Sequence, residues 1–247
     1  AKFYREISLL GKRFPGRNSY PGDIFYTHAR LLERAGNFIT SKGENSITCL
    51  PVVETTQGDL SGYIQTNLMS MTDGHIYFDI DLWVKGRRPG INTFLSVTRV
   101  GRQTQTDLNR SVSRELTSFL TLYDKMQNFV HFGAELTASV KDTLAQGDTI
   151  LDFFTITSDK DVPEQLQLIL FSLLWQGTWQ KKPFIAMRDD ISKILKQHET
   201  EPVFRQQVAA LVQKNTSFNG LLNDVRQQFP QYIANTPPVP DTKGVQK

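Results

Sequence analysis

The spacing of apolar residues changes near residue 105, and this change constrains the fold more than any other feature of the sequence. Before it, short strand-like runs alternate with loops and a helix-like run, which is typical of an α/β layer arrangement. After it, apolar residues recur at steps of three and four as far as about residue 230, the spacing of one face of a helix. We therefore predict the fold class α/β followed by all-α, with a first domain over residues 1–105, a helical bundle over 106–232 and a disordered tail over 233–247.

Two apolar runs in the first part predict strands. Residues 46–55 place β-branched and apolar side chains between turn formers, and we expect this strand to be buried. The only cysteine, Cys49, lies in this run, so it is expected to be buried too, and it has no partner for a disulfide within the chain. Residues 76–80 predict a second strand, and residues 24–34 predict a helix with Asp23 as its N-cap.

The second part predicts helices that pack as a bundle. Residues 108–130 carry apolar side chains on one face and predict a long helix. Residues 134–146 predict a second helix, which Gly147 is expected to end because glycine readily adopts the backbone conformation found just after a helix. The run over 165–176, before Gly177, is apolar almost all round and predicts a buried helix. Further helices are expected over residues 183–198, 200–215 and 218–229.

Charge and hydropathy narrow the classes of function. The 28 basic and 25 acidic residues are mixed along the chain, so no basic stripe indicates a nucleic-acid partner, and none is expected. No apolar run approaches the roughly 20 residues that cross a bilayer, so membrane association is expected only through partners. The sequence opens at Ala1 in a helix-like run, and we expect further sequence upstream of it.

The sequence lacks the motifs of a self-contained hydrolase. Its four histidines are scattered without Cys or carboxylate at ligand spacing, so no metal site is expected. It contains no Gly-x-Ser-x-Gly elbow and no Gly-x-x-x-x-Gly-Lys-Ser/Thr phosphate loop. Any contact with ATP would therefore be made without a phosphate loop of this chain.

Three stretches nevertheless form a recognisable series. They cover residues 15–35, residues 50–61 and residues 70–101, the last including Lys-Gly-Arg-Arg-Pro-Gly-Ile-Asn and Leu-Ser-Val-Thr-Arg-Val-Gly. In order and spacing they resemble the α subunit of F-type ATP synthases, well over about residues 5–140 and weakly beyond. The resemblance implies the C-terminal part of a RecA-like nucleotide-binding domain, followed by a C-terminal helical domain.

The resemblance also implies a role for Arg99, which falls on the arginine finger of that family. A guanidinium is always charged and offers donors in a planar fork, so it suits the charge that develops on a transferring phosphoryl group. Ser70 and Ser96 match family serines at the same subunit interface, with purely structural turns as the alternative. Arg88 and Trp83 match positions that border the nucleotide of the non-catalytic site in that family. The alternative interpretation is that Arg88 lies in a solvated basic turn and that Trp83 is a core aromatic residue.

Two further segments bear on this resemblance. Residues 131–136 are similar to the family segment that contacts the central shaft. Residues 154–159 depart from the family, which usually has an adenine-contacting Gln-x-Gln-Tyr-like segment there. The departure puts tight nucleotide binding at the non-catalytic site in doubt.

Partners, cofactor and location follow only from the resemblance. It implies a non-catalytic α-type subunit in a hexameric ring with β subunits, a central-shaft γ subunit, and indirectly a peripheral stalk and a proton-translocating membrane rotor. The implied cofactor is ATP or ADP with Mg²⁺, whose phosphate and metal ligands would lie outside this chain. The implied location is the cytoplasmic face of a bacterial plasma membrane, or alternatively the matrix side of the mitochondrial inner membrane.

Two other classes of protein remain open. A related ring ATPase, such as a protein-export ATPase or a Rho-like helicase, would also need an interface arginine, but with its own phosphate loop or RNA-binding loops. A degenerate interaction protein would keep the ring-packing surfaces without responding to nucleotide.

Overall fold

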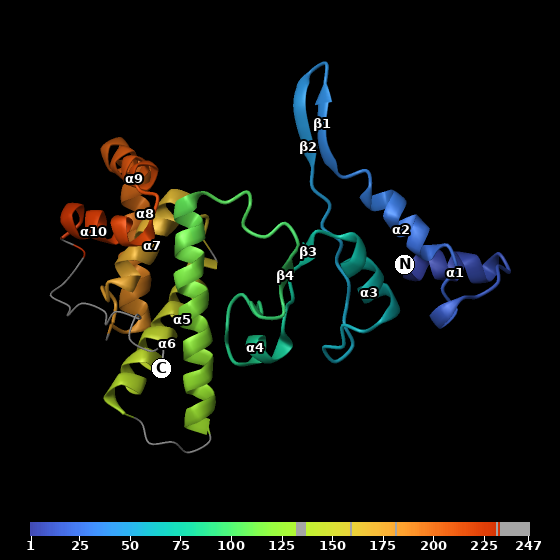
Figure 1. Cartoon of the computed structure of the whole chain (residues 1–247), viewed down its shortest axis with the longest axis horizontal. Helices are drawn as coiled ribbons and strands as arrows, with labels where there is room; N and C mark the ends of the chain where they lie inside the picture. The colour runs from blue at the N-terminus through green and yellow to red at the C-terminus, as the bar shows by residue number, and fades with distance from the viewer. Residues whose placement is uncertain (132–136, 159, 181, 231, 233–247) are drawn as a thin grey trace. The chain divides into compact units, whose positions relative to one another are not determined.

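The computed structural model describes residues 1–131, 137–158, 160–180, 182–230 and 232 (Figure 1). The chain divides into two compact units. The N-terminal unit comprises Ala1–Gly86 and Gly90–Gly101, and the helical unit comprises Arg87–Pro89 and Arg102–Lys247. A small strand-containing region is thus followed by a helical one, which confirms the predicted fold class.

The N-terminal unit is built from short elements. In chain order they are α1 (Lys2–Leu10), the 3₁₀ turn η1 (Arg17–Ser19), α2 (Ile24–Leu32), β1 (Gly36–Thr40), β2 (Gly43–Ile47), α3 (Tyr63–Met71), β3 (Gly74–His75), α4 (Ile80–Val84) and β4 (Val97–Thr98). β1 and β2 form an antiparallel hairpin, and β3 pairs with β4, also antiparallel. The predicted helix after Asp23 is confirmed as α2, although the Asp23 carboxylate accepts hydrogen bonds from Tyr4 and Arg13 rather than from the helix.

The prediction of a buried strand over residues 46–55 is wrong. β2 ends at Ile47, and none of the residues from 48 to 55 is buried, with Leu50 80% and Val52 94% accessible. Cys49, expected to be buried, is exposed as well. An apolar, β-branched run becomes a strand only where a neighbouring strand pairs with it, and the described residues place none there.

The predicted strand over residues 76–80 is also wrong as a continuous element. β3 comprises only Gly74–His75, and beyond it Phe78 makes a single isolated bridge to Ile91. The chain then turns into α4, because the Asp79 carboxylate accepts a hydrogen bond from the N–H of Asp81 at 2.9 Å and caps the new helix. A local cap thus overrides the strand preference of the apolar side chains before it.

The helical unit contains the main hydrophobic core. Its helices are α5 (Asp107–His131), α6 (Ala138–Ser158), α7 (Glu164–Trp175), α8 (Phe184–Thr200), α9 (Pro202–Lys214) and α10 (Phe218–Gln228). α7 is buried along most of its length, as predicted, and packs against α9 and α10, while α5 and α6 lie side by side (Figure 1). The rings of Phe171, Trp175 and Phe218 meet at centroid distances of 5.6 to 5.7 Å.

Gly147 does not end a helix, contrary to our prediction, but lies in the middle of α6. A Cβ atom at this position would stand only 2.0 Å from Cδ2 of Tyr123, a buried residue of α5. Glycine is therefore present because the tyrosine ring lies directly on the backbone of α6, not because the chain turns. By contrast, Gly177, with φ of +81°, follows α7 where its end was predicted.

Among the described residues, no helix combines the length and the apolar character needed to cross a membrane.

Candidate functional site

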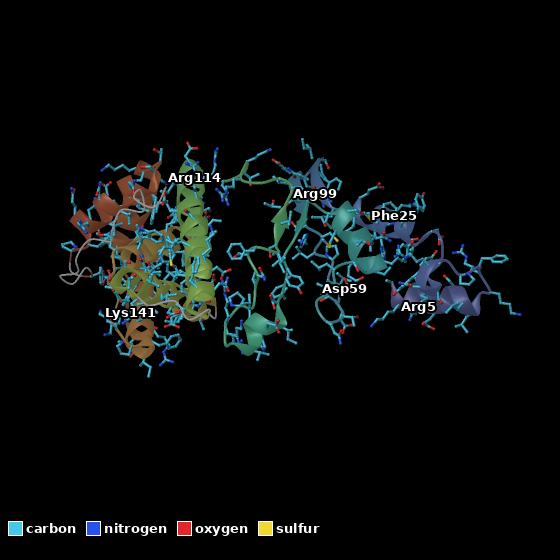
Figure 2. The ribbon with its side chains drawn as sticks, turned by 60° about the horizontal axis from the view of Figure 1, so that its bottom comes forward. Arg5, Phe25, Asp59, Arg99, Arg114 and Lys141 are labelled. Atoms are coloured by element: carbon cyan, nitrogen blue, oxygen red, sulfur yellow. The ribbon has the colours of Figure 1, made fainter. Side chains whose placement is uncertain are left out.

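Arg99 directly follows β4 and lies against the end of α3 (Figure 2). Its backbone N–H donates to the carbonyl oxygen of Asp73 at 2.8 Å. Its guanidinium donates from Nη1 to the carbonyl of Ser70 at 2.9 Å and from Nη2 to the carbonyl of Met69 at 3.0 Å. These are carbonyl groups of the last turn of α3, which a helix leaves without intrahelical partners and where its dipole favours a cation.

The pairing of β3 with β4 fixes the position of the Arg99 backbone relative to the end of α3. Gly74 pairs with Thr98 and His75 with Val97. A Cβ atom on Gly74 would lie 2.4 Å from the carbonyl oxygen of Val97. The backbone of Gly74 also has a φ of +150°, a conformation that residues with a side chain rarely adopt. The two backbones can approach this closely only because residue 74 is glycine.

The structure brings Ser70 and Arg99 together through the backbone of Ser70. The Ser70 hydroxyl itself donates to the carbonyl of Asn67 in its own helix at 2.7 Å. Ser96 is half-buried, donates from Oγ to the carbonyl of Asn92 at 2.6 Å, and accepts the N–H of Tyr77 at 3.0 Å. In this structure both serine hydroxyls therefore serve the local fold of the segment that carries Arg99.

The two residues predicted to border a nucleotide belong to different units. Trp83 lies on α4 in the N-terminal unit and is 52% exposed. Arg88 belongs to the helical unit, and its Nη1 donates to the carbonyl of Arg87 at 3.0 Å. The peptide bond between Arg88 and Pro89 is cis.

Asn92 and Asp79 form a polar pair that sequence reasoning missed. Asn92 Nδ2 donates to Asp79 Oδ2 at 2.9 Å, and Asn92 Oδ1 accepts the N–H groups of Phe94 and Leu95, each at 3.1 Å. The hydrogen bond from Asn92, with backbone N–H groups of α4, holds the pKa of Asp79 below its usual range despite partial desolvation. The position of Asn92 at the end of the Lys-Gly-Arg-Arg-Pro-Gly-Ile-Asn stretch was the available signal.

Three sequence predictions fall partly or wholly beyond the described residues. Of the segment expected to contact a central shaft, residues 132–136 lie outside them, and so does the tail 233–247. The divergent segment 154–159 lies in α6 except for Asp159, which is also outside. Within it Phe154 packs against the hydrophobic core and Ile156 is buried, so these residues serve helix packing.

Within the described ranges, His, Cys, Asp and Glu side chains form no group of three or more that could hold a metal ion. The guanidinium of Arg99 itself offers hydrogen-bond donors and a positive charge, which suit phosphate oxygens, whereas the groups that contact it are backbone carbonyl oxygens.

Comparison with known families identifies the class of domain. Residues 1–98 match the model of the nucleotide-binding domain of the ATP synthase alpha/beta family. The match covers nearly all of the N-terminal unit and ends one residue before Arg99. It supports the alpha/beta family, and with it a nucleotide-binding ring subunit, for this part of the chain. Because that family groups alpha and beta chains together, the match does not separate the two.

Proposed function

We propose that this chain is the non-catalytic, alpha-type subunit of a rotary, proton-translocating ATP synthase. In this role it alternates with beta-type subunits in a ring and donates Arg99 to the ATP site of a neighbour. The family match over residues 1–98 supports the ring subunit. The resemblance of residues 95–101 to the finger segment of alpha-type subunits supports a contribution in trans.

The observation that carries the proposal is the anchoring of the Arg99 guanidinium. The side chain is exposed, yet two of its N–H groups are bound to carbonyls of α3. A guanidinium has five N–H donors, so three remain to bind phosphate oxygens while the anchor holds. Arginine side chains carry about 2 kcal/mol of rotamer entropy, and a group fixed before the reaction loses less of it at the transition state.

The chemistry proposed for Arg99 is electrostatic. Charge spreads over the oxygens of the γ-phosphoryl group as it is transferred, and a fixed cation with a planar donor fork stabilises that charge. Arginine fingers of this kind typically raise the rate by about 10³ to 10⁵-fold. Mg²⁺ and the phosphate loop would be supplied by the neighbouring subunit, while Arg88 and Trp83 are proposed to border the nucleotide of the non-catalytic site.

The same proposal assigns the remaining partners. The ring would surround a gamma-type shaft and connect indirectly to a peripheral stalk and a membrane rotor, at the cytoplasmic face of a bacterial plasma membrane or the matrix side of a mitochondrial inner membrane.

Steady-state ATP hydrolysis by a ring assembled with beta-type subunits tests the role of Arg99. Arg99→Lys keeps the charge but loses the fork, so we expect turnover to fall by about a hundredfold or more while the ring stays intact. Arg102→Lys makes the same change at an exposed arginine three residues along and is expected to leave turnover unchanged. Normal turnover of an intact Arg99→Lys ring would refute the finger and favour an interaction protein without nucleotide response.

A further inference from the structure

The segment that carries Arg99 is held at both of its ends. At the far end, the backbone and guanidinium of Arg99 bind the end of α3 and the turn after it. At the near end, Asn92 donates its backbone N–H to the carbonyl of Tyr77 at 3.0 Å, and Asp79 donates its N–H to the carbonyl of Gly90 at 2.7 Å. The position of Arg99 therefore depends on the turn that starts at Asn92.

Asn92 builds this turn almost alone. Its side-chain oxygen accepts the N–H groups of Phe94 and Leu95. Its backbone carbonyl accepts both the N–H of Ser96 at 3.0 Å and the Ser96 hydroxyl at 2.6 Å. Four hydrogen bonds within residues 92–96 thus end on one residue, which sets the direction in which the chain leaves toward β4.

Asp79 fixes the orientation of the Asn92 side chain. Its Oδ2 accepts from Asn92 Nδ2, while its Oδ1 accepts the N–H of Asp81 at the start of α4. While the nitrogen of the Asn92 amide donates to the Asp79 carboxylate, the oxygen of the same amide faces the N–H groups of Phe94 and Leu95. Lys85, which directly follows α4, is the charged group that acts on the pair, and it favours the ionised form of Asp79.

We infer that Asn92, oriented by Asp79, is a positioning residue for Arg99, because it fixes the turn from which the Ser96 to Arg99 segment leaves. This inference rests on the proposed function of Arg99 in ATP hydrolysis. Neither Asn92 nor Asp79 needs to contact nucleotide in this role. Substitutions at Asn92 or Asp79 should change turnover only because they change the conformation of residues 94–99.

Reversing the polarity of the pair is the decisive perturbation. Asn92→Asp places two carboxylates within hydrogen-bond distance, so they repel each other near pH 8 and share a proton at lower pH. Adding Asp79→Asn restores one amide and one carboxylate in reversed order. In that swapped pair the new amide at position 79 can still accept from the N–H of Asp81. The new carboxylate at position 92 can still accept from the N–H groups of Phe94 and Leu95.

Hydrogen exchange of the full chain measures the turn directly. In Asn92→Asp we expect the amides of residues 94–99 to exchange about tenfold faster near pH 8, after correction for intrinsic rates, with recovery at a pH low enough for the two carboxyl groups to share a proton. The swapped variant should return to within about threefold of the original protein. Asp59→Asn is the matched control, because Asp59 accepts the N–H of Ser61 at 2.7 Å in the same local geometry but has no bond to Asn92.

ATP turnover in the assembled ring follows the same variants and separates the two proposals. We expect Asn92→Asp to lower turnover about tenfold near pH 8 and the swapped pair to restore it, with nucleotide affinity unchanged. If Arg99→Lys abolishes turnover while Asn92→Asp does not, the positioning role is wrong and the function of Arg99 stands. If Arg99→Lys has no effect, the proposed function is wrong, and exchange at residues 94–99 alone then decides whether Asn92 holds the segment. A swapped pair that restores neither readout refutes the inference.

Discussion

The contact between Gly147 and Tyr123 predicts how the helical unit responds to a single methyl group. Gly147→Ala would place a Cβ atom 2.0 Å from Cδ2 and 2.3 Å from Cε2 of the tyrosine ring. Carbon atoms in ordinary contact lie about 3.5 Å apart, so the ring must move by roughly 1.5 Å. Tyr123 is only 4% exposed, and its hydroxyl donates to Asp148 at 2.5 Å while accepting from Gln127 at 2.6 Å.

The size of the effect follows from three contributions. Overpacking a well-filled site costs about 1–3 kcal/mol, and loss of a hydrogen bond to a charged group costs about 1.5–3 kcal/mol. Alanine favours a helix interior over glycine by about 1 kcal/mol, which opposes both. Burial first, and then Asp148, raise the pKa of Tyr123, so its hydroxyl stays protonated and this donor is present at neutral pH. We expect Gly147→Ala to destabilise the helical unit by about 2–4 kcal/mol.

Denaturant unfolding followed by tryptophan fluorescence measures this change. Trp175 and Trp179 lie in the core of the helical unit, and a Trp83→Phe background removes the tryptophan of the N-terminal unit. Lys141→Ala, at an exposed position of α6, is the control and should change stability by less than about 0.5 kcal/mol.

A double-mutant cycle tests the cause of the effect. In a Tyr123→Ala background the ring is gone, so Gly147→Ala should become stabilising by about 0.5–1 kcal/mol through helix propensity alone. The packing argument fails if Gly147→Ala is neutral in the original chain, or if its sign does not change when the ring is removed.

Two further predictions concern the same unit. Burial first, and then the charge of Arg205, lower the pKa of His198, so the unfolded chain takes up a proton before the folded one and stability falls as the pH drops below about 6.5. His198→Phe should flatten this part of the curve of unfolding free energy against pH, and an unchanged slope would contradict the assignment. The hydroxyl of Ser217 accepts the N–H of Gly220 and caps α10, so Ser217→Ala should cost about 1 kcal/mol of unfolding free energy and Ser217→Asp much less. Equal stability of the two Ser217 variants would show that the cap contributes nothing.

Helices of the second unit could be predicted from the sequence because their signals are local. The apolar face of α5 and the all-round apolar surface of α7 follow from spacing alone. The end of α7 before Gly177 was also predictable, since a positive φ is strongly favoured by glycine. The same reasoning failed at Gly147, because glycine is required there by the ring of Tyr123 on another helix. The spacing of residues within one helix does not reveal such a contact.

Strands of the first unit were predicted less well because their signals depend on partners. Residues 46–55 have the composition of a buried strand, yet the strand ends at Ile47 and no residue from 48 to 55 is buried. Composition indicates what could pair but does not supply the neighbouring strand. The turn into α4 shows the opposite case, in which one capping carboxylate at Asp79 decided the local structure.

The candidate site, too, could be predicted only in part from the sequence. The motif around Arg99 selected the arginine, and the planar fork of its side chain gave a chemical reason for the choice. The carbonyls that hold it belong to Met69 and Ser70, whose backbone groups carry no sequence signature. A side-chain motif can therefore select a candidate residue, whereas the backbone groups that orient its side chain are known only from the fold.

Because the Arg99 guanidinium is hydrogen-bonded to α3, only some substitutions can test its proposed function. The guanidinium binds carbonyls at the end of α3, so Arg99→Ala would remove both the proposed catalytic cation and the hydrogen-bond partners of a helix end. Loss of turnover in that variant would not distinguish the two causes. Arg99→Lys keeps a cation near the helix end, and Asn92→Asp leaves Arg99 itself intact while it disturbs the turn that leads to it. Only a change that moves Arg99 without altering it can test whether its position, as well as its charge, contributes to the proposed reaction.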